Sequence, residues 1–277
     1  MTQEHHGVLD TAPVHVDDTG GTGRPVVLIH GWPLSGESWG EQVDALVAEG
    51  YRVITYDRRG FGRSEKPESG YEYDTLADDL AAVLEARDLT DATLIGFSMG
   101  GGEVARYIAR HGQDRLRSIV FAAAVPPYLA QTEDNPEGPL DADSAASMRQ
   151  GLENDRDGFF DQFITDFFSV DGDIKVSEEQ RQAALRLAHQ SDQRAALLCM
   201  DAFAGTDFRE DLRHVSVPTL VVHGNSDATV PLEGSGQRTH EAISDSVLHV
   251  IEGGPHGINT SHATEFNRAV LDFLDAN

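Results

Sequence analysis

Cysteine is almost absent from this sequence. The single cysteine, Cys199, leaves no partner for a disulfide within the chain, and disulfides are rare in reducing compartments. Cys199 lies in the apolar stretch 195–200, with no motif of a metal-binding or nucleophilic cysteine around it. We therefore predict a buried packing residue without a catalytic role, in a protein of a reducing compartment.

Long apolar runs are lacking as well. No run approaches the roughly 18 consecutive apolar residues that suggest a membrane span. Residues 1–20 show neither the basic start nor the apolar centre of a secretory signal. With 39% hydrophobic and 25% charged residues, the composition is that of a globular protein. The sequence predicts a cytoplasmic protein without a membrane partner.

Positive charge is scarce. Asp and Glu number 47 against 21 Lys and Arg, which gives a formal net charge of −26, and the lysines are Lys66 and Lys175 alone. Such a field repels phosphates, which argues against nucleic acid as a partner. The acidic residues are spread along the chain, so we interpret them as a solvated surface. We predict adaptation to high salt, where screening relieves the self-repulsion.

What the sequence does contain is a regular alternation of strand and helix. Short apolar runs without polar alternation are typical of strands buried on both faces. This pattern predicts an α/β fold with a mostly parallel sheet flanked by helices. The expected strands are residues 26–30, 52–56, 92–97, 116–123, 219–224 and 246–251, and the expected helices are residues 38–49, 74–89, 100–110, 232–242 and 261–276.

The alternation is interrupted once. Between residues 126 and 215 the β-branched runs disappear, and phenylalanines recur at near-helical spacing, at Phe159, Phe160, Phe163, Phe167 and Phe168. We predict a core of residues 1–125 and 216–277 and a helical cap of residues 126–215. The phenylalanines are expected to form the core of the cap, with room for part of them to face a substrate cavity.

The sharpest motif is a G-x-S-x-G run at residues 96–100. It stands where an expected buried strand ends and a helix begins. In that setting it predicts a nucleophile elbow, a tight turn whose glycines allow close packing while the serine hydroxyl projects over the sheet edge. Nucleotide-binding loops need glycines and a lysine that are missing here. Ser98 is therefore the predicted nucleophile.

A serine hydroxyl needs a base that takes its proton, and the base needs a group that orients it. His256 stands in the glycine-rich loop 253–257, between the last expected strand and the last helix, from which it can reach across the carboxyl ends of the strands. We predict His256 as this base. Other histidines lie at the N-terminus, on expected helices or inside a strand, namely His5, His6, His111, His189 and His249.

The acid that orients the base is expected between nucleophile and histidine, at the end of a strand. Asp227, which follows strand 219–224, fits this order, and the strand that ends near residue 123 is followed by no carboxylate. Asp57 precedes the nucleophile. We interpret its loop, residues 57–64, as a structural turn with internal charge pairing.

Acyl transfer also needs N–H donors for the oxyanion that develops in the transition state. Met99, directly after the nucleophile, supplies one at a helix start. The turn 30–33 supplies the other, from Trp32, because Pro33 has no N–H. The indole of Trp32 either packs in the interior or lines the pocket, and the sequence leaves both open.

With these residues placed, the chain resembles the cofactor-free haloperoxidases, also called perhydrolases, a bacterial group of α/β hydrolases that includes esterases and lactamases. The resemblance rests on HGWPLSGESW at 30–39, GYRVITYDRRGFGRS at 50–64, GFSMGGGEVARY at 96–107, TDFREDL at 206–212 and EGGPHG at 252–257. Two features depart from the group: Trp32 stands where many members have Phe, and Gly101 and Gly102 replace a more varied pair.

The resemblance implies the α/β-hydrolase fold and an acyl-enzyme on Ser98. Water would resolve this intermediate to a carboxylic acid, and hydrogen peroxide would resolve it to a peracid, which then oxidises halide without haem or metal. It implies a triad of Ser98, Asp227 and His256 and oxyanion donors at Trp32 and Met99, with no cofactor and no metal ligand.

A small carboxylic ester or other acyl compound is the expected substrate, with hydrogen peroxide and halide as further reactants. A lactamase or amidase of the same group is the alternative. A hydroxynitrile lyase with the same triad and a non-catalytic small-molecule receptor also stay open, whereas dehalogenation and epoxide opening use Asp at the elbow, which Ser98 argues against. The sequence does not decide between a monomer and a homo-oligomer.

Overall fold

Seven strands form the central sheet of residues 14–277, the part of the chain that the computed structural model describes. Their order is β1-β3-β2-β4-β5-β8-β9, and every neighbouring pair is parallel except β1 with β3. The strands are β1 (Val16–Asp18), β2 (Pro25–Ile29), β3 (Arg52–Tyr56), β4 (Ala92–Phe97), β5 (Leu116–Ala122), β8 (Thr219–Gly224) and β9 (Val247–Ile251). The predicted α/β fold with a mostly parallel sheet is confirmed.

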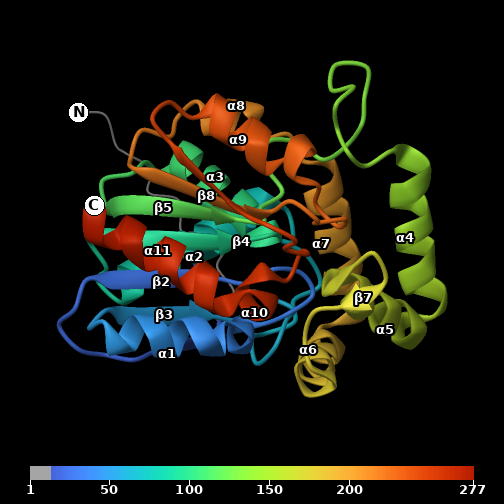
Figure 1. The fold of residues 1–277 in the computed structure, drawn as a ribbon, viewed down its shortest axis with the longest axis horizontal. Helices are drawn as coiled ribbons and strands as arrows, with labels where there is room; N and C mark the ends of the chain where they lie inside the picture. Colours follow the sequence, from blue (N-terminus) through green and yellow to red (C-terminus); the bar gives the residue numbers. More distant parts are fainter. Residues whose placement is uncertain (1–13) are drawn as a thin grey trace.

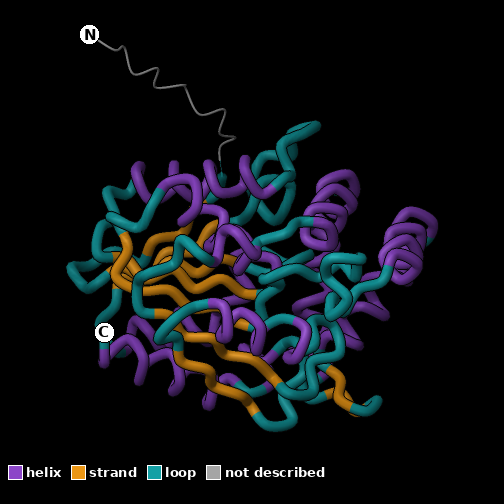
Figure 2. Tube along the Cα trace, turned by 90° about the horizontal axis from the view of Figure 1, so that it is seen from above, coloured by secondary structure: helices purple, strands orange, loops and turns teal. Residues whose placement is uncertain are grey.

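The central strands are buried because their apolar runs face helices on both sides of the sheet. All residues of β4 and β8 are buried, and residues 26–29 of β2 are fully so. Figure 2 shows helices on the two sides of the sheet. On one side lie α1 (Gly40–Ala48) and α11 (Ala263–Ala276), which pack on each other, and on the other lie α2 (Tyr73–Ala86) and α3 (Met99–His111) (Figure 1). The short helix α8 (Arg209–Leu212) packs on α3, and α9 (Gly236–Ala242) packs on β8 and β9.

Several element boundaries differ from the sequence prediction. The predicted helix 38–49 begins with a 3-10 turn, Gly36–Trp39, before α1. The predicted helix 232–242 is a 3-10 turn followed by α9, because Ser235, at φ −139° and ψ −83°, leaves the helical conformation. The predicted helix 261–276 is α10 (Ile258–Ser261) followed by α11, with His262 outside helical geometry between them.

The chain between β5 and β8 carries a group of helices that lie beside one end of the sheet (Figure 1). They are α4 (Ala142–Asn154), α5 (Arg156–Phe167), α6 (Glu178–Gln190) and α7 (Gln193–Gly205). Each of the four has a side-chain N-cap, from Asp141, Asp155, Ser177 and Asp192 respectively, which accepts a hydrogen bond from a first-turn amide. A two-stranded ribbon of β6 (Ser169–Val170) and β7 (Asp173–Ile174), which the sequence did not predict, joins α5 to α6.

No helix among residues 14–277 has the length and apolar character needed to cross a membrane. The predictions about an export signal and about His5 and His6 fall wholly or largely on residues 1–13, which lie outside the described residues.

Candidate active site

Ser98 occupies a strained turn between β4 and α3. Its φ of 53° and ψ of −120° are conformations that non-glycine residues rarely adopt. The turn needs its two glycines because there is no room for a side chain at either position. A Cβ at Gly96 would lie 2.5 Å from the carbonyl oxygen of Gly100, and a Cβ at Gly100 would lie 2.5 Å from that of Ile29. The local sequence thus builds an elbow that projects the serine from the sheet edge.

Three side chains predicted from the sequence come together at this edge. The Nε2 atom of His256 lies 2.9 Å from the Oγ atom of Ser98, and its Nδ1 atom lies 2.7 Å from Oδ2 of Asp227. Ser98 follows β4, Asp227 follows β8, and His256 follows β9. Because parallel strands end at the same edge, residues far apart in sequence meet there. The arrangement can pass a proton from the hydroxyl to the imidazole.

The carboxylate of Asp227 is buried and held from several directions. Its Oδ1 atom accepts hydrogen bonds from the N–H groups of Thr229 at 2.9 Å and Val230 at 2.8 Å. Burial opposes ionisation, but the charge of His256 and the hydrogen bonds from His223 and His256 together lower the pKa of Asp227 to about 2. An ionised carboxylate in this position would favour the imidazolium that proton transfer from Ser98 to His256 would create.

His223, at the end of β8, is a neighbour of this acid that the sequence reasoning missed. Its Nε2 atom lies 2.7 Å from the carbonyl oxygen of Val230, which can only accept, so Nε2 carries the proton. The same Nε2 atom lies 3.3 Å from Oδ2 of Asp227. Its Nδ1 atom is buried and has no hydrogen-bond partner within the described chain. His223 therefore positions the acid and the loop that follows it.

The turn after β2 passes close to Ser98. A Cβ at Gly31 would lie 3.0 Å from the Cβ of Ser98 and 2.7 Å from the ring of Phe97. Trp32, the next residue, lines the same cavity as Ser98. Met99 is the first residue of α3, and amides in the first turn of a helix have no acceptor within it. The two residues predicted as oxyanion donors therefore lie near Ser98, and their role stays a prediction.

A buried polar cluster anchors that turn from below. The N–H of Arg58 donates to Nε2 of His30 at 2.9 Å, and Nη2 of Arg58 donates to the carbonyl oxygen of His30 at 2.6 Å. The Arg58 guanidinium is paired with Glu103 on α3. Burial and the charge of Arg58 lower the pKa of His30 to about 3, so His30 stays neutral and its Nδ1–H donates to the carbonyl oxygen of Gly31 at 2.9 Å. The cluster connects the turn after β2 to α3, the helix that follows Ser98.

The indole of Trp32 both packs and lines the pocket, the two options that the sequence left open. Its Nε1–H donates to the carbonyl oxygen of Ala196 on α7 at 3.0 Å. Its ring makes edge-to-face contacts with four phenylalanines of the inserted helices, at 5.0 to 6.3 Å between centroids, namely Phe159, Phe160, Phe163 and Phe203. The side chain of Trp32 therefore joins the turn to α5 and α7.

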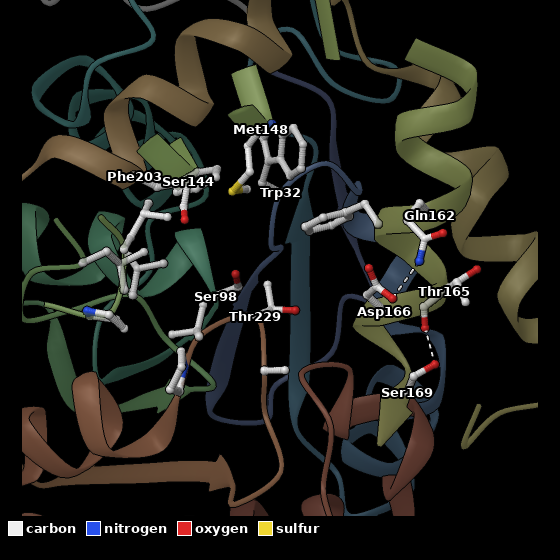
Figure 3. A pocket seen from close by; sticks show the side chains of 18 of the residues that line it. Trp32, Ser98, Ser144, Met148, Gln162, Thr165, Asp166, Ser169, Phe203 and Thr229 are labelled. Carbon is white, nitrogen blue, oxygen red and sulfur yellow. Dashed lines mark hydrogen bonds between the residues drawn. The ribbon is translucent and has the colours of Figure 1, made fainter. Parts of the chain in front are cut away.

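A cavity of about 760 Å³ opens onto Ser98. Trp32, Phe203 and Met148 lie on one side of Ser98 in Figure 3, and Gln162 and Asp166 of α5 lie on another. The loop 228–231, which follows Asp227, is also part of the lining. The inserted helices thus cover the edge of the sheet at which the three catalytic candidates meet.

Cys199 and Asp57, to which the sequence assigned structural roles, lie outside this cavity. Cys199 is buried, and burial raises the pKa of its thiol to about 12, as suits a packing residue. Asp57 lies in the turn where it was expected, and it accepts hydrogen bonds from the backbone and side chain of Arg63, both at 2.8 Å. Within residues 14–277 no group of three or more His, Cys, Asp or Glu is arranged to hold a metal ion.

Residues 24–263 match the sequence profile of the alpha/beta hydrolase fold. The chain belongs to the α/β-hydrolase family. This α/β hydrolase is 44% identical over 274 residues to a putative non-heme chloroperoxidase of Synechocystis sp., which covers 98% of the chain and 97% of the relative. It is 36% identical over 268 residues to a bifunctional esterase/perhydrolase of Acinetobacter calcoaceticus, with 96% and 97% covered.

Among solved structures, this α/β hydrolase resembles a bromoperoxidase from Bacillus anthracis, with a TM-score of 0.92 and 54% sequence identity over 96% of the chain and 98% of that structure. The predicted resemblance to the non-heme haloperoxidases is confirmed. The protein is an enzyme of the α/β-hydrolase family.

Proposed function

We propose that this enzyme is a serine esterase that hydrolyses small carboxylic esters through an acyl-enzyme on Ser98 and that also uses hydrogen peroxide as the acyl acceptor. The observation that carries the proposal is the hydrogen-bonded series from Ser98 through His256 to Asp227 at the floor of a cavity. The similarity to an esterase/perhydrolase and to non-heme chloroperoxidases supports it.

In the first half-reaction His256 takes the proton of Ser98 while Oγ attacks the ester carbonyl carbon. The carbonyl oxygen gains negative charge, which the N–H groups of Trp32 and Met99 stabilise. The carbon–oxygen bond to the alcohol then breaks, and the alcohol leaves with the proton from His256. Asp227 stays ionised throughout and holds the imidazole in the orientation that both proton transfers need.

In the second half-reaction the acyl acceptor enters the same cavity. His256 removes a proton from water or hydrogen peroxide, the remaining oxygen attacks the acyl carbon, and Ser98 leaves with the proton returned by the imidazole. Water gives a carboxylic acid and peroxide gives a peracid. A peracid transfers its terminal oxygen to bromide or chloride, which yields hypohalous acid and the carboxylate. Halide oxidation then requires no metal or haem.

Two further assignments belong to this proposal. The segment 126–215 acts as a cap over the core formed by residues 1–125 and 216–277, which agrees with the cavity lying between α4, α5 and the sheet edge. The enzyme works in the cytoplasm, which agrees with its single buried cysteine.

A fluorophosphonate probe tests the nucleophile. The wild type is expected to be labelled and Ser98→Ala to be unlabelled, with at least a thousandfold lower ester hydrolysis. An unlabelled, folded wild type would favour a non-catalytic receptor. The acyl acceptor is tested by measuring how the acyl-enzyme from short-chain esters partitions between water and peroxide; if peroxide never competes, an esterase without perhydrolase activity stands. Lactams assayed in parallel distinguish the lactamase alternative.

A further inference from the structure

The cavity above Ser98 is larger than a short-chain acyl group needs. Its volume of about 760 Å³ lies well within the range of roughly 300 to 1,000 Å³ that suits ligands of drug size. An acetyl group would leave most of this space to water. The shape and chemistry of the lining therefore carry information about the substrate beyond the ester bond.

One part of the lining is apolar and aromatic. It is formed by Trp32, Leu140, Met148, Phe159, Phe163 and Phe203. The Trp32 ring is held at 5.0 Å from that of Phe163 and at 5.7 Å from that of Phe203, and its hydrogen bond to Ala196 fixes its orientation. Such a wall gains free energy by covering apolar surface of a substrate, most of all a branched or aromatic group.

The mouth of the cavity is acidic. Asp166 on α5 and Asp171 in the β6–β7 turn line the cavity and are exposed to solvent. Gln162 donates to Oδ1 of Asp166 at 2.8 Å, which holds this carboxylate on the cavity side of α5 (Figure 3). Neither carboxylate forms an ion pair within residues 14–277, and no Lys or Arg is among the lining residues. Within residues 14–277, no ion pair therefore neutralises these two carboxylates.

We propose that the substrate is an uncharged ester with a bulky apolar group, aromatic or branched, and that Asp166 and Asp171 reject substrates that carry a carboxylate. The inference rests on the proposed esterase function, whose site it specifies further. The apolar wall takes the bulky group, and the two carboxylates repel an anion on its way to Ser98.

The rejection of anionic substrates is tested with two p-nitrophenyl esters of nearly equal shape, the 5-methylhexanoate and the hemiglutarate. The hemiglutarate has a carboxylate where the 5-methylhexanoate has an isopropyl group. We expect the ratio of kcat/KM, neutral over anionic, to fall roughly fivefold in Asp166→Asn/Asp171→Asn, because two like charges that line the cavity are removed. Salt at 1 M should lower the wild-type ratio in the same direction. Asp173→Asn, on the same ribbon but outside the lining, should keep the wild-type ratio within twofold.

The size rule is tested with p-nitrophenyl acetate against p-nitrophenyl 3-phenylpropanoate. Wild type is expected to prefer the phenylpropanoate at least tenfold in kcat/KM, and Phe163→Ala and Met148→Ala should each lower this preference, with the acetate as internal control for folding. An unchanged charge ratio in the double variant, or a preference for acetate, overturns the inference while the esterase function stands. If no ester is hydrolysed, the esterase function itself fails.

Discussion

Any side chain introduced at Gly100 would collide with the backbone of β2. Its Cβ would lie 2.5 Å from the carbonyl oxygen of Ile29, an atom that is fixed in the central sheet. Gly100→Ala is therefore expected to lower the free energy of unfolding by about 1 to 3 kcal/mol, the usual cost of overpacking. Chemical denaturation measures this loss.

Gly40 provides the matched control for that substitution. It begins α1, and a Cβ there would have no atom within 4 Å. Gly40→Ala should leave the stability unchanged or raise it by up to about 1 kcal/mol, because alanine loses less backbone entropy than glycine in a helix. Equal losses in the two variants would contradict the steric account of the elbow.

The ionisation of Asp227 is expected to make the free energy of unfolding depend on pH. Its pKa of about 2 in the folded protein is below the value of about 3.9 in an unfolded chain. A lowered pKa contributes stability above pH 4 that is lost as the pH falls toward 2. The difference in unfolding free energy between wild type and Asp227→Asn should therefore narrow by about 1 kcal/mol between pH 6 and pH 3. A difference that stays constant would contradict the lowered pKa.

At the scale of elements, the indole of Trp32 connects the turn after β2 to α7. Trp32→Phe would remove the hydrogen bond that the indole donates to the carbonyl oxygen of Ala196, and a bond of this kind contributes about 0.5 to 1.5 kcal/mol. We expect lower thermal stability together with a lower kcat, because the turn carries a proposed oxyanion donor.

The substitution Trp39→Phe is a control that separates the effect of losing the hydrogen bond from the effect of losing ring volume. It is also buried, but its Nε1 has no hydrogen-bond partner among residues 14–277. Trp39→Phe should therefore destabilise the protein by about 0.5 to 1.5 kcal/mol less than Trp32→Phe. Calorimetry and ester hydrolysis on both variants check this, and equal effects would argue against a connection through Ala196.

The sheet could be predicted largely because its central strands are short, apolar and bounded by turns. β4 and β8 have the predicted residue ranges, since nothing competes with burial on both faces. β1 was missed because it is a three-residue, partly exposed edge strand, whose pairing with β3 leaves no periodic pattern in the sequence. The helix breaks at Ser235 and His262 were missed because neither position carries a glycine or proline.

The candidate site was predictable to the extent that motifs place residues on strand ends. The elbow motif and the chain order single out Ser98, Asp227 and His256, and the structure brings these side chains within hydrogen-bond distance. Their catalytic roles stay predictions. His223 escaped notice because it reads as an ordinary strand residue, and the contact of Trp32 with α7 joins residues 164 positions apart, which no local pattern reports.

At the scale of the whole molecule, the net charge of −26 opposes compaction. Many arginines are paired with carboxylates, and salt weakens those exposed ion pairs. Because the acidic residues outnumber the available cations, we expect the relief of repulsion by salt to exceed this loss. We therefore expect the thermal midpoint to rise between 0.05 M and 2 M potassium chloride. A flat or falling midpoint would remove the hypothesis of adaptation to high salt.

The hydrogen bond between His256 and Ser98 spans 158 positions of the chain. Ser98 follows β4 and His256 follows β9, and β5 and β8 lie between these strands in the sheet, so the contact requires all four strands to be in place. If Ser98 reacts as proposed, covalent labelling of its hydroxyl would count the native molecules in a sample. A chain whose β8 and β9 have not docked on the sheet has no base beside Ser98, so it would not be labelled. The stoichiometry of labelling during refolding would then follow completion of the fold, independently of helix content or fluorescence.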